Sequence, residues 1–409
     1  MTPVPGTGGF GLRDLGLRVY GPSLLYALGL GAIMPVIALS ALDAGASVSA
    51  SALVVTLVGV GSLVMNVPAA LLTSRFGERV SMIVAAAVAA VAMVAAIVSP
   101  NLWVLSSAVL LVGMAGSVFN LARQSYLAEA VPAYFRARAM STLGGTLRIG
   151  AFVGPFLSAA VMVPLGLAGA YWVGFVAMAG AAVVGFAVPD LPARAGGTGT
   201  TTVVRAASGA PAGAPRPESM RRIAREHART YATVGIGVFV LAAVRATRNV
   251  VLPLWSDHLG LDATMAAVVY GISAAVDVIV FYPAGHVMDR FGRIYSAVPC
   301  LLLLGVALAL LPLAADVQAL AWVGALMGFG NGLGTGIVMT LGADYAPAHA
   351  RPQFLGIWRL LTDAGMMAGP VALSAVTAVA TLGAGIFVVA AAAFVGTGVF
   401  AYFLPRSRD

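Results

Sequence analysis

Charged residues are scarce in this chain, lysine is absent and cysteine occurs only once. Only 9% of the 409 residues are charged, against about a quarter in an ordinary soluble domain, so the composition excludes a soluble fold. Cys300, the single cysteine, lies within an apolar run, which excludes disulfides and a cysteine-based metal site. The 4 histidines are scattered, with no pair at ligand spacing. We therefore predict neither a metal site nor a cofactor.

Long apolar runs are abundant instead, and 60% of the residues are hydrophobic. A helix needs about 20 residues to cross a hydrocarbon core of about 30 Å. The runs between polar breaks predict twelve such helices, at residues 20–42, 50–73, 80–98, 102–126, 139–163, 168–188, 231–255, 264–287, 294–313, 318–343, 353–378 and 382–404. The expected fold class is an all-α membrane protein.

The arginines orient these helices. Eighteen of the 23 lie in the two terminal segments and in alternate connections between the helices, whereas the other connections hold no arginine. Those other connections contain Asp43, Asp257, Asp262 and Asp316. By the positive-inside rule the arginine-bearing side is cytoplasmic. Both termini are then cytoplasmic, and we expect the protein in the cell (inner) membrane. The net charge of +8 thus reflects topology in the lipid bilayer, and we expect no nucleic-acid partner.

The chain divides into two six-helix bundles, residues 20–188 and 231–404, with cytoplasmic segments at 1–19 and 405–409. Residues 189–230 form the one long connection, and its part up to 217 is rich in Gly, Ala, Pro and Thr, as is typical of a flexible linker. From 218 to 229, Glu218 and Arg222 stand four residues apart and arginines occupy most of one side. This pattern predicts a short helix that either lies on anionic lipid or is solvated.

The two halves align at an offset of 215 residues. The shift superimposes Arg75-Phe76-Gly77 on Arg290-Phe291-Gly292, Glu129, Pro132 and Arg136 on Asp344, Pro347 and Arg351, Gly113 on Gly328, and Gly150, Gly154 and Pro155 on Gly365, Gly369 and Pro370. Several unrelated matches at one shift indicate two parallel, pseudo-symmetric repeats of six helices.

The connection after the eighth predicted helix reads GHVMDRFGR from Gly285 to Arg293, which resembles the GxxxDRxGR signature of the major facilitator superfamily. Its counterpart after the second helix keeps Arg75, Gly77 and Arg79 but has Ser74 in place of the aspartate. The resemblance implies a twelve-helix secondary transporter of the drug or metabolite exporter type.

In that superfamily, pairs at these connections latch the cytoplasmic side in the outward-open state. Asp289 can lie at a helix N-terminus or accept from an arginine, for which Arg351 is the natural partner. Because Ser74 lacks charge, we expect the latch of the first half to be weaker, or Glu78 or Glu129 to substitute. The alternative is that these charges only set the topology. The gate candidates are Arg75, Gly77, Arg79, Glu129, Arg136, Gly285, Asp289, Arg290, Gly292, Arg293, Asp344 and Arg351.

Two glycine patterns lie within predicted helices. Gly150-x-x-x-Gly154-Pro155 resembles the antiporter motif of the superfamily, which favours export, although small residues four apart also arise by chance in a chain with 49 glycines. The glycine-rich run 328–336 follows no strand and is therefore no dinucleotide loop. We expect a flexible, cavity-lining helix with Asn331 available to the substrate, or alternatively close helix packing.

Ionisable residues inside predicted spans cost at least about 2.5–3.5 kcal/mol each at the centre of an isolated helix, so they should face protein or water. They are Arg123, Arg148, Arg245, Arg248, Asp277, Arg359 and Asp363. The fifth and eighth helices pack across the two halves in the superfamily, so Arg148 and Asp277 are a candidate bridge. Asp363 can pair with Arg359 on its own helix or reach Arg245. Arg123 lies near the cytoplasmic end and is expected to serve Glu129 or the loop.

These charges suggest how transport is coupled to protons. The pKa of a carboxylate rises in a dehydrated cavity and falls beside a guanidinium, so separating such a pair moves a proton. Asp277 is the first candidate for the proton site and Asp363 the second, the alternative for each being a permanent structural bridge. The excess of arginine disfavours cationic substrates, and Arg245 and Arg248 could hold a carboxylate or phosphate. We expect a neutral, zwitterionic or anionic substrate.

The sequence therefore predicts a monomeric, proton-coupled exporter of a small organic molecule that works by alternating access. One alternative is a proton symporter that imports an organic anion. Another is a non-transporting scaffold or sensor with the same fold. No spaced set of nucleophile, base and oxyanion donors is recognisable, so an enzyme is not expected.

Overall fold

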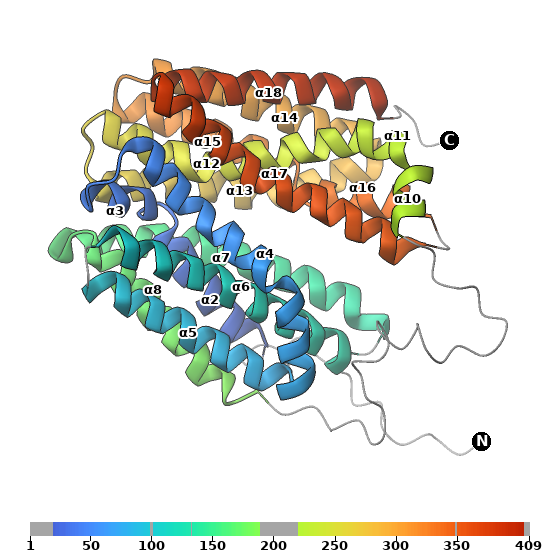
Figure 1. Cartoon of the computed structure of the whole chain (residues 1–409), viewed down its shortest axis with the longest axis horizontal. Coiled ribbons are helices and arrows are strands. Elements are labelled where there is room, and N and C mark those ends of the chain that lie inside the picture. Colours follow the sequence, from blue (N-terminus) through green and yellow to red (C-terminus); the bar gives the residue numbers. More distant parts are fainter. Residues whose placement is uncertain (1–18, 99–100, 132, 189–219, 348–349, 405–409) are drawn as a thin grey trace.

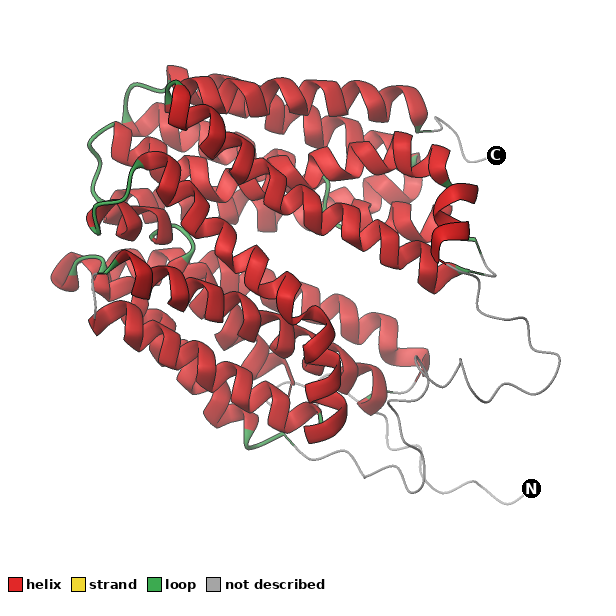
Figure 2. Ribbon diagram, viewed as in Figure 1, coloured by secondary structure: helices red, strands yellow, loops and turns green. Residues whose placement is uncertain are grey.

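The computed structural model describes residues 19–98, 101–131, 133–188, 220–347 and 350–404, and nearly all of them are helical (Figure 2). Within this part of the chain, twelve spans are long and apolar enough to cross a membrane. The fold class and the number of helices predicted from the sequence are confirmed. The predicted linker up to residue 217 and both terminal segments lie outside the described residues.

The first half contains six spans, and the first of them is interrupted after Ile33, where Pro35 cannot donate a helical hydrogen bond. The helices are α2 (Gly21–Ile33) with α3 (Ile37–Asp43), α4 (Val48–Phe76), α5 (Glu78–Val98), α6 (Leu102–Ala130), α7 (Ala133–Leu165) and α8 (Ala168–Gly185).

The second half begins with a π-helical turn, Tyr231–Gly235, that continues into α12 (Ile236–His258). It goes on with α13 (Ala263–Phe291), α14 (Ile294–Leu310) with a short 3-10 turn (Leu311–Leu313), α15 (Val317–Leu333), α16 (Ile337–Tyr345), α17 (Arg351–Val379) and α18 (Leu382–Phe403). Before it, α10 (Met220–Glu226) and α11 (Ala228–Thr230) lie where a short helix was predicted. The ion pair in α10 is Arg222–Glu226, at 2.7 Å, whereas Glu218 lies outside the described residues.

The tenth span is two helices, and the prediction of one continuous helix from 318 to 343 is wrong. It breaks between Leu333 and Ile337, where Gly336 adopts a φ of +78°. Side chains other than glycine rarely adopt that conformation, so this glycine permits the break. The C-terminal end of α15 is thereby placed inside the protein, where its carbonyl groups need partners.

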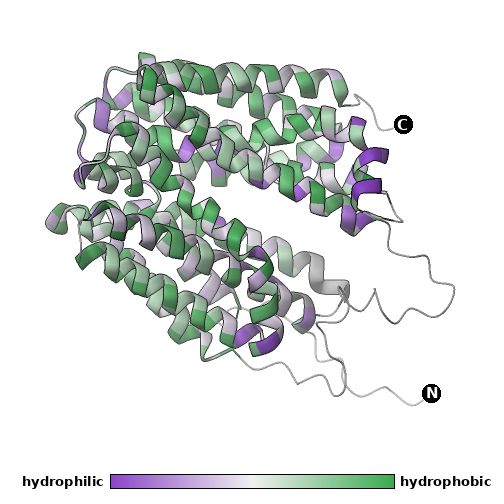
Figure 3. Cartoon of the chain, in the orientation of Figure 1, coloured by the Kyte–Doolittle hydropathy of each residue, from purple (hydrophilic) through white to green (hydrophobic). Residues whose placement is uncertain are grey.

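The helices form two bundles side by side, α2–α8 and α12–α18 (Figure 1). We call the end where α4 and α13 terminate the arginine-rich end, because Arg75, Arg79, Arg290 and Arg293 lie there. At the opposite end, Asp262 and Asp316 cap the N-termini of α13 and α15 by accepting hydrogen bonds from the backbone. Hydrophobic residues make up most of the helical ribbon (Figure 3), and many large apolar side chains are exposed, as lipid contact requires.

The two bundles touch near the opposite end and diverge toward the arginine-rich end (Figure 1). Ser374 of α17 donates a hydrogen bond to the carbonyl oxygen of Ser49, at the start of α4, at 2.8 Å. The ring of Phe156 in α7 lies against Gly271 in α13, where a Cβ atom would come within 2.8 Å of it. The helices of the two bundles are therefore in contact near the opposite end and farther apart at the arginine-rich end (Figure 1).

The helix contacts within each bundle repeat at the offset found in the sequence. In each case a glycine of one helix lies directly on a backbone carbonyl of its neighbour, leaving no room for a Cβ atom. The matched pairs are Gly113–Val58 with Gly328–Ser273, Gly150–Leu24 with Gly365–Phe239, and Gly154–Leu28 with Gly369–Ala243, each displaced by 215 residues. The internal repeat is thus a repeat of three-dimensional packing.

Candidate functional site

An ion pair joins the two bundles near the middle of their helices. Nη1 of Arg148, in α7, lies 3.0 Å from Oδ1 of Asp277, in α13, and the side chains are 24% and 13% exposed. Nη2 of Arg148 donates to Oγ1 of Thr335 at 2.9 Å, and the guanidinium carbon lies 4.4 Å from the ring centroid of Phe281. The contact predicted between Arg148 and Asp277 is confirmed.

A second layer of polar groups lies behind Asp277. Nδ2 of Asn331 donates to Oδ2 of Asp277 at 2.8 Å, so each carboxylate oxygen has its own donor. Nη2 of Arg245 donates to the carbonyl oxygen of Asn331 at 3.3 Å and lies 3.8 Å from Sγ of Cys300. Arg245 thus supplies a hydrogen-bond donor to the C-terminal end of α15, at the helix break. Neither Arg245 nor Asn331 presents its bonded atoms to a substrate in this arrangement.

A central cavity of about 370 Å³ lies between the bundles and adjoins the ion pair. Residues of α2, α6, α7, α12 and α13 line it. Its charged lining consists of Arg123, Arg148, Arg248 and Asp277. Of the predicted substrate partners, Arg148 and Arg248 therefore face this space together.

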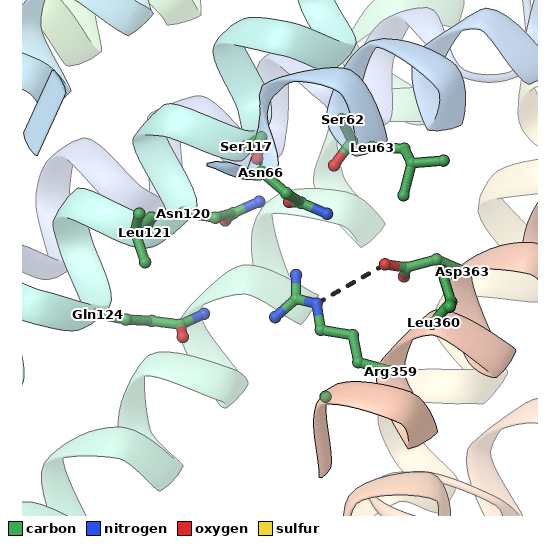
Figure 4. Close-up of a pocket in the computed structure, with 11 residues that line it drawn as sticks. Ser62, Leu63, Asn66, Ser117, Asn120, Leu121, Gln124, Arg359, Leu360 and Asp363 are labelled. Carbon is green, nitrogen blue, oxygen red and sulfur yellow. Dashed lines mark hydrogen bonds and ion pairs between the residues drawn. The ribbon is translucent and has the colours of Figure 1, made fainter. Parts of the chain in front are cut away.

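A second pocket of about 360 Å³ lies between α4 and α6 on one side and α17 on the other. Figure 4 shows the guanidinium of Arg359 extending from α17 into this space, with its Nε 3.7 Å from Oδ2 of Asp363. Asp363 therefore pairs with Arg359, and not with Arg245 as the alternative supposed. The facing wall carries Leu63 and Leu121, and its polar side chains, all uncharged, come from Ser62, Asn66, Ser117, Asn120 and Gln124.

The central ion pair and the Arg359–Asp363 pocket are related by the internal repeat. The offset of 215 residues places Asp363 at the position equivalent to Arg148, and Ser62 at the position equivalent to Asp277. The interface between α7 and α13 is bridged by opposite charges. The equivalent interface between α17 and α4 has a carboxylate on one side and a hydroxyl on the other. The repeat conserves the geometry while the charges differ.

The motif Gly150-x-x-x-Gly154-Pro155 holds α7 against α2. A Cβ atom on Gly150 would lie 2.7 Å from the carbonyl oxygen of Leu24, and one on Gly154 would meet the carbonyl of Leu28. Ser158 donates to the Pro155 carbonyl at 2.9 Å, within the same helix. The motif therefore fixes the position of the helix that carries Arg148.

The sequence profile of the Major Facilitator Superfamily matches residues 23–228 and 234–409, which is nearly the whole chain. The chain belongs to the major facilitator superfamily. It is accordingly a multi-pass membrane transporter and not an enzyme.

Solved structures of other superfamily transporters resemble the chain along almost its full length. A bacterial homolog of the human lysosomal transporter Spinster, in an inward-facing and unoccupied conformation, gives a TM-score of 0.76 at 12% identity, over 96% of this chain and 97% of that one. A POT family transporter in complex with a thioalcohol-conjugated peptide gives 0.76 at 11%, over 96% of each chain. The D-xylose-proton symporter gives 0.69 at 15%, over 97% and 98%. No curated protein matches the sequence.

The two superfamily loops have the same construction in both halves. Gly77 and Gly292 adopt φ angles of +84° and +107°, which let the chain reverse after α4 and α13. The guanidinium carbons of Arg75 and Arg290 each lie 5.5 Å from the ring of the following phenylalanine. Gly285 lies in α13 with open space where a Cβ atom would be. These motif residues therefore shape the loop.

Arg293 is the centre of the charged contacts beside the second loop. Its Nε lies 2.8 Å from Oδ2 of Asp344, and its Nη1 lies 3.6 Å from Oδ1 of Asp289. In this arrangement Asp289 therefore pairs with Arg293, one helical turn beyond it, and the pairing with Arg351, which was predicted for the outward-open state, stays a prediction. Arg351 is exposed at the start of α17.

In the first half Ser74 stands at the position equivalent to Asp289, and its hydroxyl donates to the Leu71 carbonyl of its own helix at 2.9 Å. Nη2 of Arg79 donates to the Phe186 carbonyl at 2.8 Å and so links α5 to the end of α8. Glu129 lies in the last turn of α6. Arg136 lies in α7, and its side chain is outside the described part of the structure.

Sequence reasoning misplaced one arginine. Arg123 is 2% exposed and lines the central cavity, with its Nη2 donating to Oδ1 of Asn120 at 2.6 Å. The prediction that it serves Glu129 or the loop is therefore wrong. Its spacing of three residues from Asn120 placed both on one side of α6, and this signal pointed to a shared interior position.

Proposed function

We propose that this transporter is a proton-coupled exporter of a small organic molecule that works by alternating access of its two bundles. The observation that carries the proposal is the Arg148–Asp277 ion pair, which joins the bundles beside the central cavity. A pair that spans two moving bodies is made or broken as they move. The protonation of its carboxylate is then linked to the conformation of the protein.

The proposal assigns the arginine-rich end to the cytoplasm, on the basis of the positive-inside rule. Both termini are then cytoplasmic, in the cell (inner) membrane, and the described arrangement is inward-open. The charged residues at and beside the superfamily loops, including Arg293 and Asp344, would form the gate at the arginine-rich end. The close contacts of Gly150 and Gly154 with α2 would hold α7, and with it Arg148, in a fixed position relative to α2 during the movement.

The cycle follows from the donors around Asp277. In the inward-open arrangement Arg148 and Asn331 each donate a hydrogen bond to it. When the opposite end opens, α7 moves from α13 and Asp277 meets the outer solution with only Asn331 as a donor, so that it takes up a proton. The return of Arg148 displaces the proton toward the cytoplasm. Substrate moves outward in the other half of the cycle.

Asp363 is the second candidate for the proton site. It is paired with Arg359, its side chain is 25% exposed, and it faces a wall of uncharged polar groups across the second pocket. Its bond to Arg359 is made within one helix, so movement of the bundles does not by itself break it. This difference is the reason for placing Asp277 first.

Proteoliposomes that contain the purified protein and a pH-sensitive dye in the lumen test the proposal. They are loaded with a panel of aromatic carboxylates, alcohols and amines and diluted into solute-free buffer. Antiport predicts that the lumen acidifies as a transported solute leaves, whereas symport predicts that it becomes alkaline. The Asp277→Asn variant should lose the pH change, and Asp257→Asn, an exposed carboxylate at the opposite end, should keep it.

A non-transporting scaffold would produce no solute-dependent change in either direction. Export coupled to protons is contradicted if transport proceeds in Asp277→Asn with the same pH change as in the wild type. Asp363→Asn, measured in parallel, decides whether the second carboxylate takes part.

A further inference from the structure

The central cavity contains more positive charge than its own carboxylate can neutralise. Three arginines and one aspartate line it, and the aspartate is already bound by Arg148 and Asn331. Arg123 and Arg248 are thus left without a carboxylate partner among the described residues. One comes from α6 of the first bundle and the other from α12 of the second.

Specific hydrogen-bond donors in this lining are unsatisfied. Nε and Nη1 of Arg123 and the same two atoms of Arg248 are buried with no hydrogen-bond partner in the described structure, and so is the hydroxyl of Tyr26. Arg248 does interact with the hydroxyl of Tyr270, but that contact supplies no negative charge. Buried polar groups in native proteins nearly always have a partner, so a cluster of exceptions that faces a cavity indicates a missing ligand.

The surroundings of Arg123 hold it in place for such a ligand. The rings of Tyr26 and Phe119 stack at 4.2 Å with an interplanar angle of 10°, and the guanidinium carbon of Arg123 lies 5.8 Å from the Phe119 ring. Asn120 fixes a third nitrogen at 2.6 Å. Nε and Nη1 remain as donors on different edges of the guanidinium, and each can form a charge-assisted hydrogen bond to an oxygen of a carboxylate, sulfonate or phosphate.

Apart from Asn120, Asn249 and the tyrosines, the rest of the lining is apolar or glycine. Leu30, Met34, Ala151, Ala274 and Val278 face the same space, and a volume of about 370 Å³ falls within the range of small-molecule sites. A ligand that satisfies both parts of the cavity has an anionic group and a hydrocarbon body. An organic cation would add positive charge to a site that already has an excess.

We propose that the central cavity binds an amphipathic organic anion, whose anionic group lies between Arg123 and Arg248 with the Tyr26 hydroxyl as a further donor. The assignment rests on the proposed transport function and names its substrate class. Because the two arginines belong to different bundles, a bound anion attracts both bundles toward itself. It also screens the repulsion that Arg248 exerts on Arg148, so substrate binding favours closure of the cavity.

Equilibrium binding to the purified full-length protein tests this assignment without a proton gradient. The probes share one ring system: 2-naphthoate, naphthalene-2-sulfonate, 2-naphthalenemethanol and 2-naphthylmethylammonium, titrated calorimetrically in detergent. We expect both anions to bind at least about tenfold more tightly than the alcohol, and the ammonium compound to bind more weakly still. Equal or tighter binding of the alcohol or the ammonium compound would overturn the assignment.

Variants locate the site. Arg123→Gln and Arg248→Gln should each weaken naphthoate binding by about tenfold or more, and Tyr26→Phe should weaken it less. Arg225→Gln, which removes the same charge from an exposed position in α10, should bind as the wild type does. Wild-type affinity in both Arg123→Gln and Arg248→Gln would refute the site. If Arg123→Gln does not fold, Arg248→Gln and Tyr26→Phe decide.

The outcome is independent of proton coupling. Anion binding with no lumenal pH change in the proteoliposome assay would leave the site intact and refute the proposed coupling. A lumenal pH change driven by an amine, with no anion binding, would do the reverse.

Discussion

Replacing Arg148 by glutamine removes the guanidinium that Asp277 contacts across the bundle interface. The side chains are 24% and 13% exposed, which places the pair between a surface ion pair, worth about 0–1 kcal/mol, and a buried one, whose disruption costs about 3–5 kcal/mol. Asn331 remains as a donor to Asp277 and reduces the loss. We expect the described arrangement to be destabilised by about 2 kcal/mol relative to one in which the pair is already broken.

A change of that size is visible in conformational populations. Since about 1.4 kcal/mol is a factor of ten, the ratio of the two arrangements should shift about 30-fold toward the one that is closed at the arginine-rich end. Asp277→Asn should shift it in the same direction, because it removes the other half of the pair. The double variant should shift it by little more than either single change.

Distances between spin labels measure this ratio. Cys300 is 0% exposed and is replaced by alanine, so that labels attach only to introduced cysteines. One labelled pair, Ser74→Cys with Tyr295→Cys, reports on the arginine-rich end, and another, Trp103→Cys with Val379→Cys, on the opposite end; all four positions are exposed. In the Arg148→Gln background the first distance should shorten and the second lengthen.

The matched control is Arg225→Gln, which should leave both distance distributions unchanged. If Arg148→Gln and Asp277→Asn are monodisperse and give the wild-type distributions, the ion pair does not bias the conformation. The coupling argument built on it would then be refuted.

Two further predictions concern the scaffold around the site. Gly154→Ala places a methyl group on the Leu28 carbonyl and should destabilise the protein by about 1–3 kcal/mol, seen as a lower melting temperature. Gly144→Ala, whose methyl group meets nothing within 4 Å, should not lower it. Equal melting temperatures of the two variants would contradict the packing argument. Arg293→Gln and Asp344→Asn should each lower the melting temperature. Because both remove the same contact at 2.8 Å, the double variant should melt no lower than the less stable single variant. Additive losses would show that the two residues act separately.

The twelve helices, the repeat and the Arg148–Asp277 contact were predictable because each depends on a strong constraint. Lipid requires long apolar helices with satisfied backbones, a repeat leaves a constant offset, and charges of opposite sign on facing helices attract. The pairing of Asp289 with Arg293 was not predictable from the motif alone. Arg293 follows Asp289 by four residues whereas Arg351 begins α17, and only the side-chain geometry shows which of them Asp289 contacts in this arrangement.

The position of Arg123 and the break in the tenth span show a different limit. Distance from a helix end suggested that Arg123 reaches the surface, but the direction of its side chain depends on the rotation of α6 against α2, which apolar periodicity leaves open in a helix that is hydrophobic on most sides. The glycine-rich run 328–336 contains the break of the tenth span. It did not reveal which glycine would take a positive φ.

Within each bundle, glycines lie directly on backbone carbonyls of the neighbouring helices. The helices of a bundle therefore have little room to shift against one another, and the bundle behaves as a stiff lever. Asp277 is at the midpoint of α13, 14 residues from either terminus, or about 21 Å at 1.5 Å per residue. With the Ser374–Ser49 contact near one extremity as the fulcrum, any displacement at Asp277 is roughly doubled at the far extremity. A small movement at midspan therefore changes the separation of the bundles at the arginine-rich end by about twice as much.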